Sequence, residues 1–356
     1  MLDHMRLMIV NYSMDEDSNV LAWQASVVRE LAKHCEKVVV LTEQIGRFTP
    51  PENVTIHLIP RRPWGIPKIL GSRLLMNFTV SRLVREHQID ACFIHMAMEW
   101  TYRLFPTLKL HRIPILLWYA HGTVTNRLRL AHACANKVIT STPEGFRLPS
   151  KKKIVIGQGI NTDLFNIPVH ATERNDILYV GRISPRKRVN LLVKAMASLK
   201  EITPELPIRL KVIGPTLSEV DRTYLDEIRT DIRRSNLTDV VEILGDMPQQ
   251  EIVAHYKSAF LHLNVSQTGS MDKTVMEALA CGCPVLTSNE AFFALLANYP
   301  EFILRTNEPG AIAERILMLY RRKYDPSAMR AIVVGSHDVK NFTQKVYNIL
   351  LMETAK

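Results

Sequence analysis

Two cations follow a short apolar run in the segment Tyr179–Arg188. The run ends at Gly181, Arg182 opens the turn, and Lys187 lies just before a segment with helical spacing. Glycine lets the backbone approach a ligand closely, and cations near a helix N-terminus hold phosphate groups. The turn therefore predicts a diphosphate clamp formed by Arg182 and Lys187. A basic turn that caps the edge of a sheet is the alternative interpretation.

A polar loop follows the apolar run that ends at Val265. The loop contains Gly269, and a helix is expected to start near Thr274, with Glu277 in its first turn. Loop amides and a helix N-terminus can hold an anion, and a carboxylate can accept two hydroxyl hydrogen bonds, as ribose recognition requires. Alternatively, Glu277 only complements the helix dipole.

Short β-branched runs alternate with segments of helical spacing along the chain. This alternation is typical of parallel sheets covered by helices. The predicted strands are Leu7–Asn11, Val38–Leu41, Val54–Ile59, Ala91–His95, Ile115–Tyr119, Val138–Thr140, Ile177–Val180, Leu210–Ile213, Val240–Leu244, Phe260–Val265 and Val285–Thr287. The predicted helices of the second half are Val189–Leu199, Tyr224–Arg234, Gln249–Ser258, Thr274–Ala280, 309–322 and 339–352.

The length of 356 residues suggests two domains, at roughly 150 residues per domain. The polar stretch 166–175 contains a proline and lacks helical periodicity, so it is the predicted linker. We expect an α/β protein with two doubly wound Rossmann-like domains, 1–165 and 176–325, that face each other across a cleft. The helices of 326–356 are expected to pack back on the first domain.

Together these motifs resemble the group 1 (family 4) glycosyltransferases of the GT-B fold. The resemblance rests on Arg182 with Lys187, and on Glu277 in the sequence Glu-Ala-Leu-Ala-Cys-Gly-Cys-Pro-Val. Two further segments occur in the family's order. Gln158–Phe165 is similar to the segment before the domain crossover, and Ile243–Pro248 is similar to the nucleotide-base loop.

The resemblance implies a nucleotide-diphosphate sugar as donor and retention of the anomeric configuration. It implies that Arg182 and Lys187 hold the donor diphosphate and that Glu277 holds the ribose hydroxyls. Leu244 and Met247 would belong to the nucleotide-base loop. No metal and no other cofactor is expected, because the two cations and the helix amides take the place of a metal ion.

The chain departs from the family pattern in the loop before the helix. The family commonly has Glu-x7-Glu, but position 269, eight residues before Glu277, is glycine. The loop resembles the Gly-Ser-x-Asp-Lys loops of a subset of these enzymes. Asp272 would then recognise sugar hydroxyls, and Lys273 and Thr274 would extend the diphosphate clamp. The glycine at position 269 therefore affects which donor sugar is expected and whether the protein is an active enzyme.

In the first domain, a predicted strand ends near His121, where the family often has a histidine beside the donor sugar. The resemblance implies that His121 orients a sugar hydroxyl or moves the acceptor proton. We therefore predict His121 and Asp272 as the catalytic residues. His95 is similarly placed, although a lone histidine is often structural. Ser13–Asn19 replaces the glycine-rich loop that the family has after its first strand.

Two patterns with metal-ligating residue types are better explained without a metal. Asp15–Asp17 is formally Asp-x-Asp, but it follows the first strand and is interpreted as a solvated turn. Cys281 and Cys283 are too few for a zinc site, so we expect them to pack at a helix end. The chain has 5 cysteines, which indicates a reducing compartment rather than a disulfide scaffold.

Positive charge is concentrated in the first half. The net charge is +10, and residues 1–165 contain 21 basic and 13 acidic side chains. Such a basic half suggests an anionic partner: a phosphorylated ligand, an acidic membrane surface or a nucleic acid. Arg61–Met76 mixes basic and large apolar residues, and it would lie on an anionic membrane or form a core helix with a basic outer face. Lys151–Lys153 is expected to be a solvated loop.

The sequence thus indicates a metal-independent hexosyltransferase. It would move a sugar from a UDP- or GDP-sugar to a saccharide or lipid-linked saccharide during cell-surface glycan synthesis. The lack of a transmembrane or signal-peptide pattern suggests a cytoplasmic protein, peripheral on the inner face of the membrane. The alternatives are a catalytically silent sugar-nucleotide-binding protein and a sugar-nucleotide epimerase of the same fold. A nucleic-acid binder is disfavoured because no nucleic-acid module is recognised.

Overall fold

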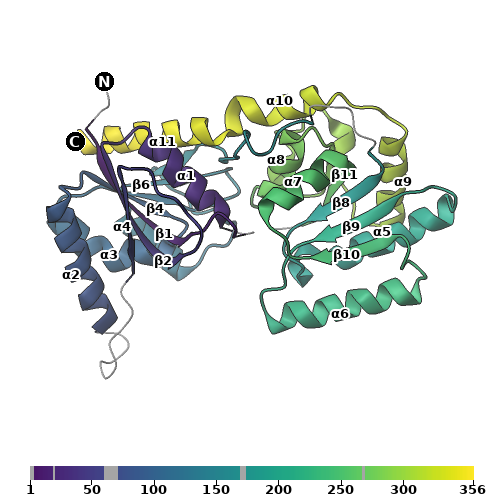
Figure 1. Ribbon diagram of the computed structural model, residues 1–356, viewed down its shortest axis with the longest axis horizontal. Coiled ribbons are helices and arrows are strands. Elements are labelled where there is room, and N and C mark those ends of the chain that lie inside the picture. Colours follow the sequence, from purple (N-terminus) through teal and green to yellow (C-terminus); the bar gives the residue numbers. More distant parts are fainter. Residues whose placement is uncertain (1–3, 19–20, 60–70, 169–173, 267–268) are drawn as a thin grey trace. The chain divides into compact units, whose positions relative to one another are not determined.

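The computed structural model describes residues 4–18, 21–59, 71–168, 174–266 and 269–356, with the side chains of 71–74 left aside. It consists of two compact units (Figure 1). The first comprises Met1–Gly159 and His337–Lys356, and the second comprises Ile160–Ser336. Each unit has its own parallel sheet with flanking helices.

The first unit contains a seven-stranded parallel sheet with the order β3-β2-β1-β4-β5-β6-β7. Its strands are β1 (Arg6–Met14), β2 (Lys37–Ile45), β3 (Val54–Leu58), β4 (Ala91–His95), β5 (Ile115–Trp118), β6 (Lys137–Thr140) and β7 (Lys153–Val155). Leu7 and Ile9 of β1 enter the core on one face of the sheet, and Met8 and Val10 enter the core on the other. Because both faces are buried, the first half of β1, Leu7–Val10, is an unbroken apolar run.

Helices cover both faces of this sheet. They are α1 (Ala22–Ala32), α2 (Gly71–Glu86), α3 (Met98–Leu110), α4 (Asn126–Cys134) and α11 (Val339–Thr354). Trp23 of α1 and Phe342 of α11 enter one core, while Val80 of α2 and Leu104 of α3 enter the other. Helix α11, at the end of the chain, therefore lies beside α1, at its beginning (Figure 1).

The second unit contains a five-stranded parallel sheet with the order β10-β9-β8-β11-β12. Its strands are β8 (Asp176–Val180), β9 (Arg209–Ile213), β10 (Val241–Gly245), β11 (Ala259–Asn264) and β12 (Val285–Thr287). Its helices are α5 (Val189–Ile202), α6 (Glu219–Arg234), α7 (Gln249–Ser258), α8 (Lys273–Ala280), α9 (Pro309–Tyr320) and α10 (Pro326–His337), with short 3₁₀ turns at η1 (Pro185–Lys187), η2 (Glu290–Phe292) and η3 (Pro300–Phe302). Helix α5 packs against α6 and α9, and α7 packs against α8.

The predicted α/β fold class, with two Rossmann-like sheets, is confirmed. Every predicted strand is present, most of them with ends that differ by one to three residues. The short edge strand β7 was not predicted, and neither were α3 and α4. The three residues of β7 are too few to show a periodicity, and unlike the equally short β12 they are not fully buried, so no buried apolar run marks this strand.

The division between the units differs from the predicted one. The second unit begins at Ile160, so the predicted linker 166–175 falls within the range of this unit, and 169–173 lie outside the described residues. Helix α10, expected on the first domain, packs on the second unit instead. Met329 and Val333 are buried in the core of that unit, and helix α11 alone of the two packs on the first.

The strand order of each sheet reverses at one point. In an open parallel sheet, ligands bind beyond the carboxyl ends of the strands at this point. The reversal lies between β1 and β4 in the first sheet and between β8 and β11 in the second. None of the helices in the described ranges combines the length and the apolar character that crossing a bilayer requires.

Candidate donor site

Two glycines shape the carboxyl ends of β8 and β9. Gly181 and Gly214 have φ angles of +151° and +144°, in the region that favours glycine. A Cβ atom on Gly214 would lie 2.0 Å from the carbonyl oxygen of Gly181, so the two backbones are too close for any side chain there. The turn that begins at Arg182 therefore starts where two backbones are in close contact and no side chain lies between them.

Arg182 is held by a buried carboxylate. Its Nε donates to Oδ2 of Asp221 over 2.7 Å, and the same oxygen accepts from the backbone N–H of Leu217 over 2.9 Å. Burial raises the pKa of Asp221, but the hydrogen bonds from Arg182 and Leu217 outweigh it and the net pKa is lowered. Asp221 thus stays ionised, while Arg182 remains 43% exposed and accessible to a ligand.

Lys187 forms a second ion pair at the other side of the turn. Its Nζ lies 2.7 Å from Oδ1 of Asp272, and the two side chains are 21% and 12% exposed. Oδ2 of Asp272 accepts from Asn264 over 2.9 Å and from Ser266 over 2.5 Å. Burial raises the pKa of Asp272, but Lys187 and the two hydrogen bonds lower it by more. The carboxylate therefore fixes Lys187 next to the start of α8. Because the Lys187 ammonium has three N–H donors, it can bind a ligand while it remains paired with Asp272.

Glu277 is buried on α8. It accepts hydrogen bonds from Tyr256 Oη over 3.2 Å and from Gln249 Nε2 over 3.3 Å. Burial raises its pKa to about 7, although Lys273, Tyr256 and Gln249 act in the opposite direction. Burial also lowers the pKa of Lys273 well below its ordinary value. The first two turns of α8 therefore carry a partly buried ammonium and a buried carboxylate, whose charged forms burial disfavours.

The expectation that Glu277 lies in the first turn of its helix is wrong. Helix α8 begins at Lys273, so Glu277 is in the second turn, and the first turn contains no acidic residue. The dipole effect falls off within the first turn. The dipole interpretation of Glu277 is therefore weakened.

The remaining donor-side residues lie on the same edge of the sheet. Leu244 is the next-to-last residue of β10, and Met247 lies two residues beyond the strand; both side chains are partly buried against the core. Thr274 is the second residue of α8 and is partly buried. Gly269 has a φ of +63°, a conformation in which glutamate is strained. The backbone at position 269 therefore favours the glycine of this chain over the glutamate of the Glu-x7-Glu pattern.

The predicted histidines of the first unit occupy different environments. His121 lies three residues beyond β5 and is partly buried, and its Nδ1 accepts from the backbone N–H of Thr123 over 3.1 Å. His95 ends β4 and is fully buried, with Trp23 4.1 Å away edge-on and Phe93 stacked at 5.3 Å. His95 is therefore part of the aromatic core, as the structural interpretation expects.

Other predicted features find structural explanations. Asp15 accepts from the backbone N–H of Arg47 over 3.1 Å. Cys281 and Cys283 are buried at the end of α8, and burial raises the pKa of each to about 12. In the described part of the chain, no group of three or more His, Cys, Asp or Glu side chains is arranged to hold a metal ion. Residues 60–70, and hence most of Arg61–Met76, lie outside the described residues.

The expectation of a solvated loop at Lys151–Lys153 is wrong for two of its lysines. Nζ of Lys152 donates to the backbone carbonyls of His132, Ala133 and Ala135, at the C-terminal end of α4. A cation there satisfies carbonyls that the helix leaves unpaired. Nζ of Lys153 donates to the carbonyl of Phe146 over 3.3 Å.

Several residues that position the site were not predicted. Asp221 carries a visible signal, because Ser218-x-x-Asp221 has the spacing of a helix N-cap, and Ser218 Oγ accepts from the backbone N–H of Asp221. Asn264 is a polar residue inside an apolar strand. Tyr256 and Gln249 have no such signal, because only the packing of α7 on α8 brings them to Glu277.

The second unit is similar in sequence to a known family. Residues 161–332 match the family described as glycosyl transferases group 1. This part of the chain belongs to the group 1 glycosyltransferases. The match covers the whole turn after β8, the loop after β11 and helix α8.

The whole chain shares the GT-B fold with solved glycosyltransferases. A glycosyltransferase from Rickettsia africae covers 99% of each chain with a TM-score of 0.77 at 14% identity. HepE from Anabaena, solved in complex with UDP, covers 98% of this chain and 100% of its own, with a TM-score of 0.77 at 17% identity. At such identities the similarity concerns the fold.

A curated relative is similar over a shorter stretch. The D-inositol 3-phosphate glycosyltransferase of Streptosporangium roseum is 28% identical over 148 residues, which are 38% of this chain and 33% of the relative. The alignment thus spans about a third of the relative's own length.

Proposed function

We propose that the protein is a retaining glycosyltransferase that transfers a hexose from a nucleotide-diphosphate sugar, a UDP- or GDP-sugar, to a hydroxyl of a saccharide or lipid-linked saccharide in cell-surface glycan synthesis. The observation that carries the proposal is the Lys187–Asp272 ion pair, which joins the turn after β8 to the start of α8. It lies at the point where the strand order of the second sheet reverses. The group 1 match and the UDP bound to HepE support the donor class.

The chemistry needs stabilisation of a leaving diphosphate. The bond between C1 of the sugar and the phosphate oxygen breaks, a bond from C1 to the acceptor oxygen forms, and the acceptor loses a proton. Arg182, Lys187 and the amides of α8 at Lys273 and Thr274 would stabilise the negative charge on the diphosphate. Charge stabilisation by fixed groups is commonly the largest catalytic contribution. We propose that no metal ion is required, because these cations are already in place.

The other roles follow from the same placement. Glu277 would accept hydrogen bonds from the ribose hydroxyls, and Leu244 and Met247 would border the base. The carboxylate of Asp272 would accept hydrogen bonds from the sugar hydroxyls while it remains paired with Lys187. Asp272 would therefore also position Lys187. His121 would orient the donor sugar or take up the acceptor proton. The proposal also includes the saccharide or lipid-linked acceptor and a peripheral attachment of the protein to the inner face of the membrane.

A first experiment measures thermal stabilisation by UDP, GDP, ADP and CMP and by their sugar conjugates at two salt concentrations. A ligand at 100 times its Kd adds about 2.7 kcal/mol to stability, enough for a shift of a few degrees. One base should stand out, and its sugar conjugate should then be turned over in the presence of EDTA. If no nucleotide shifts the melting temperature, the donor assignment fails.

A second candidate function is motivated by Gly269. A sugar-nucleotide-binding protein without catalysis would bind one donor but neither hydrolyse nor transfer it. NMR of the reaction separates the cases. Transfer with an unchanged anomeric configuration supports the proposal, conversion of the donor sugar without an acceptor indicates an epimerase, and binding without turnover indicates a silent protein.

A further inference from the structure

A cavity lies at the amino ends of the strands of the second sheet, away from the donor-side residues. Its volume is about 820 Å³, within the range of small-molecule sites. Asn175 directly precedes β8, Phe260 begins β11 and Pro284 directly precedes β12, so the cavity lies at the amino ends of these parallel strands. The donor-side residues lie at the carboxyl ends. The segment from Tyr320 to Ser327, between α9 and α10, closes the other side.

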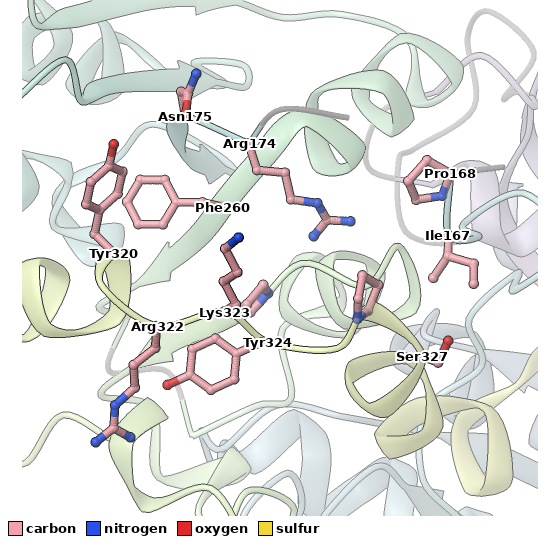
Figure 2. A pocket seen from close by; sticks show the side chains of 12 residues that line it. Ile167, Pro168, Arg174, Asn175, Phe260, Tyr320, Arg322, Lys323, Tyr324 and Ser327 are labelled. Carbon is pink, nitrogen blue, oxygen red and sulfur yellow. The ribbon is translucent and has the colours of Figure 1, made fainter. Parts of the chain in front are cut away.

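The described lining of this cavity is cationic. Arg174, Arg322 and Lys323 line it, and none of the twelve described lining residues is acidic. Arg322 is paired with Glu301 outside the lining, at 3.5 Å. No carboxylate of the described part of the chain forms an ion pair with Arg174 or Lys323. Figure 2 shows both of these side chains directed toward the middle of the cavity.

Arg174 is fixed by the end of a helix. Its guanidinium donates to the carbonyl of Gly282 over 2.5 Å and to that of Cys281 over 3.4 Å, just beyond α8. A cation in this place complements the C-terminal end of the helix dipole. Its position is therefore set before any ligand binds, which lowers the entropy cost of binding an anion.

Aromatic rings form the other part of the wall. The rings of Phe260 and Tyr320 meet edge to face at 5.1 Å. Tyr324 packs on Phe302 at 5.0 Å, and its Oη donates to Glu301. Figure 2 shows Phe260 and Tyr324 on two sides of Lys323. Rings held in this way offer flat apolar surfaces beside fixed positive charge.

We propose that this cavity is a second ligand site, which binds a small phosphate ester that carries a ring. Arg174 and Lys323 would hold the phosphate, and the rings of Phe260 and Tyr324 would contact the ring of the ligand. A sugar phosphate and a nucleoside monophosphate share this chemistry. The site is separate from the donor site and goes beyond the proposed transfer reaction, and the two sites lie at opposite ends of α8.

Titration calorimetry on the full chain tests the proposal. The probes are glucose 6-phosphate and AMP, with glucose and adenosine as their uncharged counterparts. A hydrogen bond to a charged group contributes enough that removing Lys323 should weaken binding about tenfold or more. We therefore expect a phosphorylated probe to bind at least about tenfold more tightly than its counterpart, and Lys323→Glu to abolish this difference. Lys323 is exposed, so the substitution should leave folding intact.

Two control variants locate the binding. Lys194→Glu changes an exposed lysine on α5 and should leave the affinity unchanged. Arg182→Ala weakens the donor site and should also leave the affinity of this cavity unchanged. Tighter binding of glucose 6-phosphate or of AMP supports the proposal and identifies the ring. The proposal is overturned if phosphate gives no gain in affinity, or if Lys323→Glu binds like Lys194→Glu.

Discussion

At the scale of single residues, the two donor-side cations share one device. Arg182 and Lys187 each pair with a carboxylate that the protein buries, Asp221 and Asp272. Each pairing fixes a flexible side chain and leaves other N–H groups available to a ligand. The clamp is therefore organised before the diphosphate arrives.

We expect Arg182→Ala and Lys187→Ala each to lower kcat/KM for donor turnover at least about 100-fold, because removing one such donor typically costs 10²–10³ in rate. Each substitution also leaves a buried carboxylate without its cation, which destabilises the protein. Lys187→Ala with Asp272→Asn is therefore the matched variant for the melting temperature, and Lys194→Ala is the surface control. Steady-state kinetics together with melting temperatures check the prediction. Near-full activity in a folded variant would remove the residue from the clamp.

The raised pKa of Glu277 makes stability depend on pH. The folded protein keeps the proton up to about pH 7, whereas the unfolded chain loses it near 4.5. Between these values the folded state binds more protons, so the free energy of unfolding falls as pH rises. The loss across this window is on the order of 3 kcal/mol.

Glu277→Gln should remove this dependence. We expect its free energy of unfolding to change less than that of the wild type between pH 4.5 and 7. Lys273 has the opposite sign, since its lowered pKa makes stability rise with pH, but both proteins retain it. Urea unfolding at several pH values gives the difference between the two proteins. Parallel stability curves would contradict the assignment.

At the scale of elements, one arginine ties α10 to the core of the second unit. Arg330 donates to the backbone carbonyls of Phe165, Ala280 and Thr162 at 2.7, 2.8 and 2.9 Å. Arg330→Ala should lower the free energy of unfolding by about 3 kcal/mol, because three carbonyls lose a charged donor. Arg330→Lys should recover only part of the loss, since an ammonium cannot reproduce the planar fork.

Chemical denaturation of both variants measures these effects, with Arg234→Ala on the exposed end of α6 as the control. Equal stability of Arg330→Lys and the wild type would show that charge alone, rather than geometry, holds α10.

The sequence predicts elements well where they are long or fully buried. The strand Val285–Thr287 and the helix Gln249–Ser258 match the structure in both ends. It fails where tertiary packing decides. Helix α10 packs on the second unit because of the hydrogen bonds of Arg330 and the burial of Met329, and no local sequence pattern predicts either contact.

The candidate site follows the same rule. Arg182, Lys187 and Glu277 are predicted because glycines, a turn and a helix start mark them in the sequence. The contacts that pair them with their partners are found only in the structure. Tyr256 lies 21 residues from Glu277 in the chain and Asp221 lies 39 from Arg182, so no local pattern connects them. Pairing over such separations is set by the strand order.

At the scale of the whole molecule, the excess positive charge belongs to the first half of the chain. Exposed apolar and basic side chains occur together there at two places. Phe78 is 68% exposed on α2, near Arg82, and Leu110 is 80% exposed at the end of α3 between Lys109 and Arg112. Basic residues around apolar ones are what an anionic bilayer surface attracts.

We expect the protein to sediment with vesicles that contain 30% phosphatidylserine and not with phosphatidylcholine vesicles, because each basic side chain near an anionic surface contributes about 1 kcal/mol. Lys109→Glu with Arg112→Glu reverses two of these charges and should weaken vesicle binding at least about tenfold. Arg233→Glu with Arg234→Glu, on α6 of the second unit, changes the net charge equally and is the matched control. If both double variants lose binding alike, net charge rather than this surface attracts the protein. If saturation with nucleotide also abolishes vesicle binding, the basic surface binds the nucleotide donor instead of the membrane.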